Sequence, residues 1–151
     1  MARAPFQVLV LPFRLVQSRI EYAVFKRADA GWWQGIAGGG EGAETALETA
    51  RRETREEAGI PENASFIPLD SKFTVPAEVF GFPWGQEILV VPEFAFGVES
   101  PDSTLRLSSE HTEARWVDYE TARQLLKWDS NRNALWELHH RLTHPKQAVS
   151  R

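Results

Sequence analysis

Apolar residues recur along the chain in two patterns, one typical of β-strands and the other of α-helices. Apolar runs rich in aliphatic and aromatic residues predict strands in five segments: residues 6–16, 19–26, 66–75, 86–98 and 114–118. Only Gln17 and Ser18 separate the first two, so we predict a tight hairpin there. Pro92 has no backbone N–H to pair, and it predicts a sheet edge or a bulge within its strand.

Helices are predicted in three segments, residues 43–58, 119–126 and 131–143. Gly59 ends the first of them, and Asp129 or Ser130 can cap the last. The glycines at residues 38–40 predict a flexible elbow before the first helix. Strands and helices are mixed without strict alternation, which predicts an α/β (α+β) fold with a mixed β-sheet sandwiched between α-helices.

The length of 151 residues suits one domain, which we place at residues 1–144, and we expect residues 145–151 to form a disordered tail. The absence of cysteine excludes disulfides and thiolate metal sites, and it agrees with a cytoplasmic protein. No apolar segment approaches the roughly 20 residues of a membrane span. The net charge of −4 argues against nucleic-acid polymers as partners, so any phosphate group must be attracted locally.

Three glutamates crowd the end of the first predicted helix. Glu53, Glu56 and Glu57 have i, i+3 and i+4 spacing, so their carboxylates project from one side and repel each other. The helix dipole disfavours them there as well. One explanation is a solvated face with salt bridges, since Arg52 and Glu56 form an i, i+4 pair. The other is a site for a hard cation, Mg²⁺ or Mn²⁺, which binds carboxylate and phosphate oxygens.

The spacing of residues around the glutamates favours the cation site. The pattern fixes the identities of Gly38, Glu44, Arg52, Glu53, Glu56, Glu57 and Gly59, and an aliphatic residue, Ile60, follows. Seven fixed identities would coincide by chance in on the order of one chain in a million. The pattern resembles the box of the Nudix family, with a departure at Thr54, where the family usually has an aliphatic residue. Because Thr54 belongs to the inward stripe of the helix, we expect this change to affect packing more than chemistry.

The resemblance implies a role for each matching residue. Glu53, Glu56 and Glu57 match the catalytic, metal-binding carboxylates of the family, and Arg52 matches the arginine that holds them in position. The carbonyl of Gly38 is expected to join the metal shell. Glu44, in the first turn of the helix, is expected to be mainly structural.

Residues outside the box are also candidates. Glu110 matches a loop carboxylate that binds metal or serves as the catalytic base, whereas the neighbouring His111 is expected to be structural. Four residues are expected to contact substrate: Arg27, Trp33, Phe80 and Trp84. Arg27 could neutralise a phosphate, and the aromatic rings, with Phe82, could either stack on a planar heterocycle or belong to the core. The segment at residues 130–132 is expected to be a helix start first and a substrate contact second.

Three further segments, residues 26–39, 110–118 and 128–138, resemble the branch of the family that hydrolyses dihydroneopterin triphosphate. The resemblance implies Mg²⁺- or Mn²⁺-dependent cleavage of that small phosphorylated molecule to the monophosphate and pyrophosphate. A pyrophosphohydrolase acting on nucleoside triphosphates or dinucleoside polyphosphates is the alternative, and a non-catalytic ligand-sensing domain is a third. Homodimers are common in the family, although no segment here specifies one.

Overall fold

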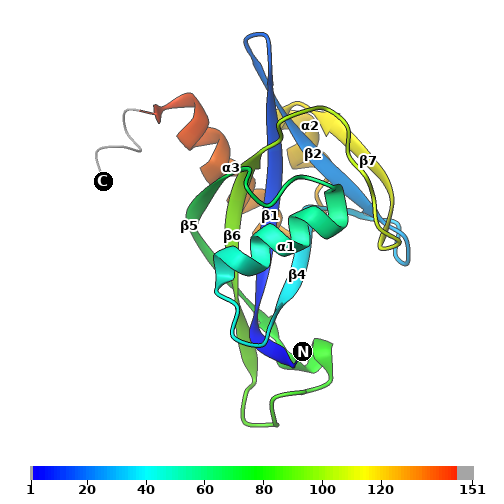
Figure 1. Ribbon diagram of the computed structural model, residues 1–151, viewed down its shortest axis with the longest axis vertical. Coiled ribbons are helices and arrows are strands. Elements are labelled where there is room, and N and C mark those ends of the chain that lie inside the picture. Colours follow the sequence, from blue (N-terminus) through cyan, green and yellow to red (C-terminus); the bar gives the residue numbers. More distant parts are fainter. Residues whose placement is uncertain (1, 146–151) are drawn as a thin grey trace.

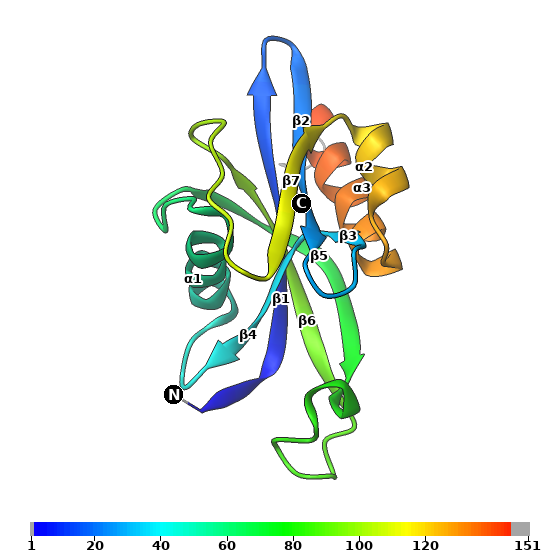
Figure 2. The same cartoon turned by 90° about the vertical axis from the view of Figure 1, so that its right-hand side faces the viewer.

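The computed structural model describes residues 2–145, within which seven strands form one mixed sheet with helices on both faces (Figure 1). In chain order the elements are β1 (Arg3–Val16), β2 (Arg19–Arg27), β3 (Trp33–Gln34), β4 (Ile36–Glu41), α1 (Ala46–Ala58), β5 (Ser65–Pro76), the 3₁₀ helix η1 (Ala77–Phe80), β6 (Val90–Glu99), β7 (His111–Val117), α2 (Tyr119–Leu125) and α3 (Asp129–Thr143). Figure 2 shows α1 covering one face of the sheet, and α2 and α3 the other. The predicted sandwich is confirmed.

The strand order is β3-β2-β1-β6-β5, while β4 also pairs with β1 and β7 with β2. The β1–β6 pair is parallel and the other pairs are antiparallel, so the sheet is mixed as predicted. The predicted hairpin joins β1 and β2, where Val16 pairs with Arg19 and Gln17 takes a positive φ of 57°. Strand β1 therefore lies at the centre of the fold.

Strand β1 is buried on both faces, because successive side chains of a strand point to opposite sides. Val8 and Val10 pack into the core beneath α1, together with Ala50 and Ala58 of that helix. Leu9 and Leu11 belong instead to the core beneath α3. This two-sided burial explains why residues 6–16 read as a nearly continuous apolar run.

Helix α1 is defined at both ends by its own sequence. The side chain of Thr45 accepts a hydrogen bond from the backbone N–H of Glu48, and the Glu48 carboxylate accepts one from the backbone N–H of Thr45, so the two form a capping box. Gly59 closes the helix in the left-handed conformation, with φ of 73°. The helix consequently begins three residues later than the predicted start at residue 43, because the cap is Thr45.

The structure corrects three other predictions. The expected flexible elbow at residues 38–40 is part of β4, where Gly38 pairs with Val8 of β1. Residues 86–89 precede β6 rather than belong to it. Pro92 pairs only with β5, because the pairing of β6 with β1 starts at Glu93, and its missing N–H is tolerated there. Helix α3 is capped at Trp128 without a side-chain hydrogen bond, so neither expected cap forms.

The expected tail at residues 145–151 lies, apart from Pro145, outside the described residues. Within residues 2–145, no helix has the length and apolar character needed to cross a membrane.

Candidate active site

The C-terminal half of α1 carries its three acidic side chains next to β4. Glu53 lies directly over Gly38, since a Cβ atom placed on Gly38 would stand 2.1 Å from the carboxyl carbon of Glu53. Glu57 turns inward, with 7% of its side chain exposed, whereas Glu56 faces outward, with 42% exposed. Position 38 therefore has to remain glycine for the Glu53 carboxylate to keep its place.

Arg52 holds this arrangement together. Its Nε donates to Glu44 at 2.8 Å, its Nη1 to Glu53 at 2.9 Å, and its Nη2 to the carbonyl oxygen of Gly39 at 2.9 Å. The hydrogen bond from Arg52 lowers the pKa of Glu44 to about 2, so Glu44 remains an anion that orients the guanidinium. The expected positioning role of Arg52 thus has a geometric basis, and Glu44 contributes to it by holding the guanidinium.

Glu57 and Glu110 come together although α1 and the loop before β7 are distant in the sequence. The hydroxyl of Ser108 donates to Glu57 and accepts from the backbone N–H of Glu110 at 3.2 Å. Burial raises the pKa of Glu110, and the neighbouring charge of Glu57 raises it further. Ser108 is a site residue that the sequence did not indicate, because a loop serine carries no distinguishing pattern.

The acidic cluster of Glu53, Glu56, Glu57 and Glu110 carries more negative than positive charge. Burial raises the pKa of Glu53 to about 7, Arg52 opposes that rise, and the charges of Glu56 and Glu57 add to it. Such a group of oxygen donors fits a hard divalent cation, which would favour the ionised carboxylates.

The ligand geometry is not preformed, however. Within residues 2–145, no three acidic or histidine side chains already converge in a group that could hold a metal ion. Glu53 is turned to Arg52 and Glu57 to Ser108, so a cation would have to replace these protein donors. The expected metal shell of Gly38, Glu53, Glu56, Glu57 and Glu110 stays a prediction.

A cavity of about 700 Å³ lies on the α3 side of the sheet, and Ala37 of β4, the residue before Gly38, belongs to its wall. Arg27 lines it, and the charges of Glu110 and Glu57 raise the pKa of Arg27, after the larger effect of its hydrogen bond to Asp29. Arg27 therefore lies at the boundary between the carboxylates and the cavity.

The predicted aromatic contacts divide into two groups. Phe80 of η1 lines the cavity, and Trp84 supports it from behind, with ring centroids 5.9 Å apart and an indole N–H that donates to the carbonyl of Arg3. Trp33 does not line the cavity. Its ring packs against the core and lies 4.9 Å from the guanidinium carbon of Arg115. Trp33 is thus placed as a packing residue rather than a contact to the cavity.

The remaining candidates have structural partners. His111 is buried, and burial lowers its pKa, while its Nδ1 lies 3.5 Å from a carboxylate oxygen of Glu57. Asn131 accepts from the backbone N–H of Gly35 at 2.7 Å and anchors α3 to the start of β4. Arg132 donates to the carbonyl of Leu126 at 2.7 Å. The sequence missed Gln7, Glu93 and Trp128 of the cavity wall, although Trp128 begins a segment used for the resemblance.

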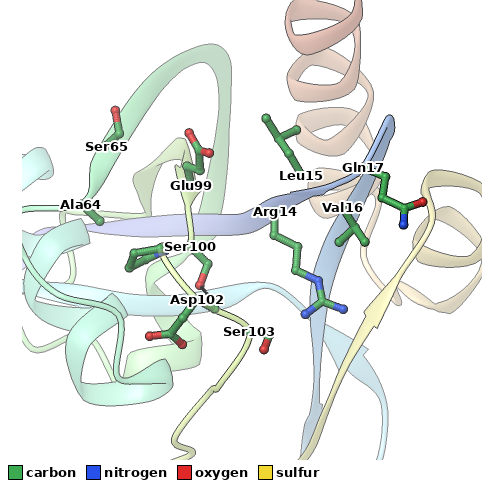
Figure 3. Close-up of a pocket in the computed structure, with 11 residues that line it drawn as sticks. Arg14, Leu15, Val16, Gln17, Ala64, Ser65, Glu99, Ser100, Asp102 and Ser103 are labelled. Carbon is green, nitrogen blue, oxygen red and sulfur yellow. Dashed lines mark hydrogen bonds between the residues drawn. The ribbon is translucent and has the colours of Figure 1, made fainter.

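A second hollow lies where β1 and β6 end, and Figure 3 shows the side chains of Arg14, Glu99 and Asp102 there pointing in different directions. None of the predicted site residues lines it. Arg27 and Phe80, two of the predicted contacts, line the other cavity instead.

Comparisons with known proteins identify the family of the chain. The model of the NUDIX domain matches residues 6–138. The dihydroneopterin triphosphate diphosphatase of Escherichia coli is 29% identical over 88% of this chain and 91% of its own. The asymmetrical bis(5'-nucleosyl)-tetraphosphatase of Mus musculus is 31% identical over 83% of each chain. A crystal structure from Listeria monocytogenes, described as a Nudix hydrolase, has a TM-score of 0.85 and 44% identity, over 94% of this chain and 97% of its own. The chain therefore belongs to the Nudix family of hydrolases, which act on phosphorus-containing acid anhydrides.

Proposed function

We propose that the protein is a pyrophosphohydrolase that cleaves a diphosphate bond with the help of Mg²⁺ or Mn²⁺. The cation would be held by the carboxylates of Glu53, Glu56, Glu57 and Glu110 and by the carbonyl of Gly38. When bound, it would stabilise charge on the phosphoryl oxygens. The all-oxygen donor set and the raised pKa of Glu53 support this proposal.

The chain's own groups would orient and activate the reactants. Arg52 holds Glu53 next to β4, and Ser108 holds Glu57 beside Glu110. Glu110 would accept a proton from the attacking water, because its raised pKa makes it a better base than an ordinary carboxylate. One of the box glutamates is the alternative base.

One observation carries the proposal: Arg27 lines the cavity, and in the sheet it pairs with His111, the residue that follows Glu110. A molecule with a ring in the cavity and a phosphate chain passing Arg27 would place its diphosphate next to the acidic cluster. The guanidinium would offset the repulsion between the phosphates and the four carboxylates.

We propose dihydroneopterin triphosphate as the substrate, with the monophosphate and pyrophosphate as products. The resemblance to the Escherichia coli enzyme and the aromatic wall at Phe80 support this choice. The second candidate is a nucleoside triphosphate or dinucleoside polyphosphate, which the resemblance to the mouse tetraphosphatase supports. A cytoplasmic location and a homodimer remain proposals that accompany this function.

The test is a hydrolysis assay with dihydroneopterin triphosphate, GTP, ATP and diadenosine tetraphosphate, each with Mg²⁺, with Mn²⁺ and with a chelator. We expect metal-dependent hydrolysis, fastest with the pterin, from which pyrophosphate is released, whereas hydrolysis of diadenosine tetraphosphate is followed by the nucleotides that it forms. A preference for ATP or diadenosine tetraphosphate would favour the second candidate.

Two variants make the assay specific. Glu56→Gln should lose at least about 100-fold in kcat, because a box carboxylate is removed. Glu62→Gln removes an exposed carboxylate that pairs with Arg55, and it should hydrolyse at the wild-type rate. Wild-type hydrolysis by Glu56→Gln would overturn the site assignment, and an intact protein without hydrolysis of any substrate would favour the ligand-sensing alternative.

A further inference from the structure

Glu93 is a buried acid in the wall of the cavity. It lies within β6, between Gln7 of β1 and Phe73 of β5, and only 8% of the residue is exposed. Side chains alternate along β6, and Ala95, two residues on, faces the α3 core, so Glu93 points to the same side as the cavity it lines.

The Glu93 carboxylate has no protein partner. No hydrogen bond or ion pair from residues 2–145 reaches it, and burial raises its pKa to about 7. A buried charge without a donor is costly, and an apolar side chain would be more stable at this position. The carboxylate is therefore available to a ligand in the cavity, which could supply the missing N–H donors.

Two amides complete the polar part of the wall. The carbonyl oxygen of Gln7 accepts from Arg3 at 2.8 Å, and that of Gln34 accepts from the indole N–H of Trp128 at 3.4 Å. The Arg3 guanidinium and the Trp128 indole can only donate, so each must face the oxygen of its amide rather than the NH₂ group. The NH₂ groups of Gln7 and Gln34 have no hydrogen-bond partner among the described residues. The cavity thus offers an acceptor at Glu93 and donors at two glutamines, beside the apolar rings of Phe73 and Phe80.

We propose that Glu93 is the residue that selects the heterocycle, by accepting two adjacent N–H groups of a 2-amino-4-oxopyrimidine ring. Pterins and guanine share this ring edge, in which a ring N–H lies next to an exocyclic NH₂ and an oxo group follows. A carboxylate accepts from both N–H groups, and a glutamine NH₂ donates to the oxo group. Adenine presents a ring nitrogen acceptor to the carboxylate instead, so it is disfavoured.

This inference rests on the proposed function, because it assumes that the cavity holds the ring of the substrate. It adds which edge of the ring forms hydrogen bonds in the cavity and that Glu93 accepts them. It also excludes adenine compounds as preferred substrates, although the second candidate function would include them.

The test measures binding of uncharged ring compounds without metal, so that hydrolysis plays no part. Neopterin, guanosine, inosine and adenosine are titrated into the protein at pH 8 by calorimetry. Inosine is the matched ligand, since it keeps the oxo group and ring N–H of guanosine but lacks the NH₂. Wild-type protein should bind neopterin and guanosine at least about tenfold more tightly than inosine or adenosine.

The variant Glu93→Gln replaces one carboxylate oxygen by an NH₂ group of the same size. It should lose at least about tenfold in affinity for guanosine and neopterin and should gain affinity for adenosine, whose edge an amide complements. Glu99→Gln changes an exposed residue at the other end of β6 and should leave the ranking unchanged. Circular dichroism of both variants establishes that they are folded, and Glu93→Asp, which keeps the charge, should keep the ranking.

Each contrary result overturns the inference. These results are equal binding of guanosine and adenosine by the wild type, no binding of any of the four, or the same ranking in Glu93→Gln. Failure of the proposed function shows separately, as the absence of pyrophosphate release from every triphosphate in the presence of metal. A protein that binds guanosine through Glu93 but hydrolyses nothing would keep this inference and lose the enzymatic proposal.

Discussion

The hydroxyl of Ser108 donates a hydrogen bond to Glu57, 51 residues earlier in the chain. The same oxygen accepts from the backbone N–H of Glu110 at 3.2 Å. One small side chain therefore joins the helix acid to the loop acid, and it fixes the direction in which the Glu57 carboxylate points. Groups that orient metal-binding residues commonly affect metal affinity as strongly as some of the ligands do.

Replacing Ser108 by alanine should weaken activity without unfolding the protein. We expect an activity loss of about 10- to 100-fold, together with weaker activation by Mg²⁺, because Glu57 and Glu110 lose their common partner. Steady-state kinetics across a Mg²⁺ titration measures both effects. Ser103→Ala, in the same loop, removes an exposed hydroxyl and should behave as wild type, and an unchanged Mg²⁺ requirement in Ser108→Ala would contradict the role.

Replacing Arg52 by lysine keeps the charge but should still impair the site. A single ammonium group cannot bridge Glu44, Glu53 and the carbonyl of Gly39 at once, whereas the guanidinium does. We expect at least about a tenfold loss in kcat and a lower melting temperature. The control Arg55→Lys alters an exposed partner of Glu62 and should change neither quantity.

The departure from the box at Thr54 has a measurable consequence for stability. Thr54 is fully buried, and its hydroxyl has no hydrogen-bond partner among the described residues. Thr54→Val should therefore raise the free energy of unfolding by about 1 kcal/mol. Thr49, in the same helix, is equally buried, but its hydroxyl donates to Glu44, so Thr49→Val should lower that free energy. Urea denaturation of both variants tests the opposite signs.

The buried carboxyl of Glu93 should make stability depend on pH. Its pKa is about 7 in the folded protein and near the ordinary 4.5 when unfolded. Below pH 4.5 the group is protonated in both states, and as pH rises to 7 only the unfolded state ionises, so the folded protein loses stability. Glu93→Gln lacks this loss, and its stability advantage should grow over that range to about 3 kcal/mol.

Urea denaturation of the wild type and Glu93→Gln between pH 4 and pH 8 measures this difference. Glu53 also has a raised pKa, but it is present in both proteins and cancels in the comparison. A difference that does not change with pH would mean that the carboxyl is not buried without a partner.

Local sequence signals predicted much of the fold and the helix that carries the three glutamates. Each of these signals spans only a few residues of the chain. They are the alternation along residues 19–26, the glycine at position 59 and the spacing of Glu53, Glu56 and Glu57. The local conformations that they specify can therefore be predicted from the sequence alone. The sandwich, the hairpin and the box helix all follow from such short-range patterns.

The rest depends on contacts between distant segments. Residues 38–40 carry no side chains that could show a strand pattern, and only their pairing with β1 makes them a strand. Gln7 and Glu93 become neighbours through the parallel β1–β6 register, which no local pattern encodes. Trp33 has the same local surroundings whether it meets a ligand or Arg115, and packing alone places it under the arginine.

Alternate residues of β4 face different halves of the site: Gly38 lies under Glu53 of α1, and Ala37 lines the cavity on the α3 side. In the proposed function the sheet thus separates bond cleavage from ring recognition, and Arg27 lies between the two. Substitutions on one face can diversify the set of accepted molecules while the carboxylates on the other stay untouched. Such a division allows new specificities to evolve, or to be engineered, without rebuilding the catalytic apparatus.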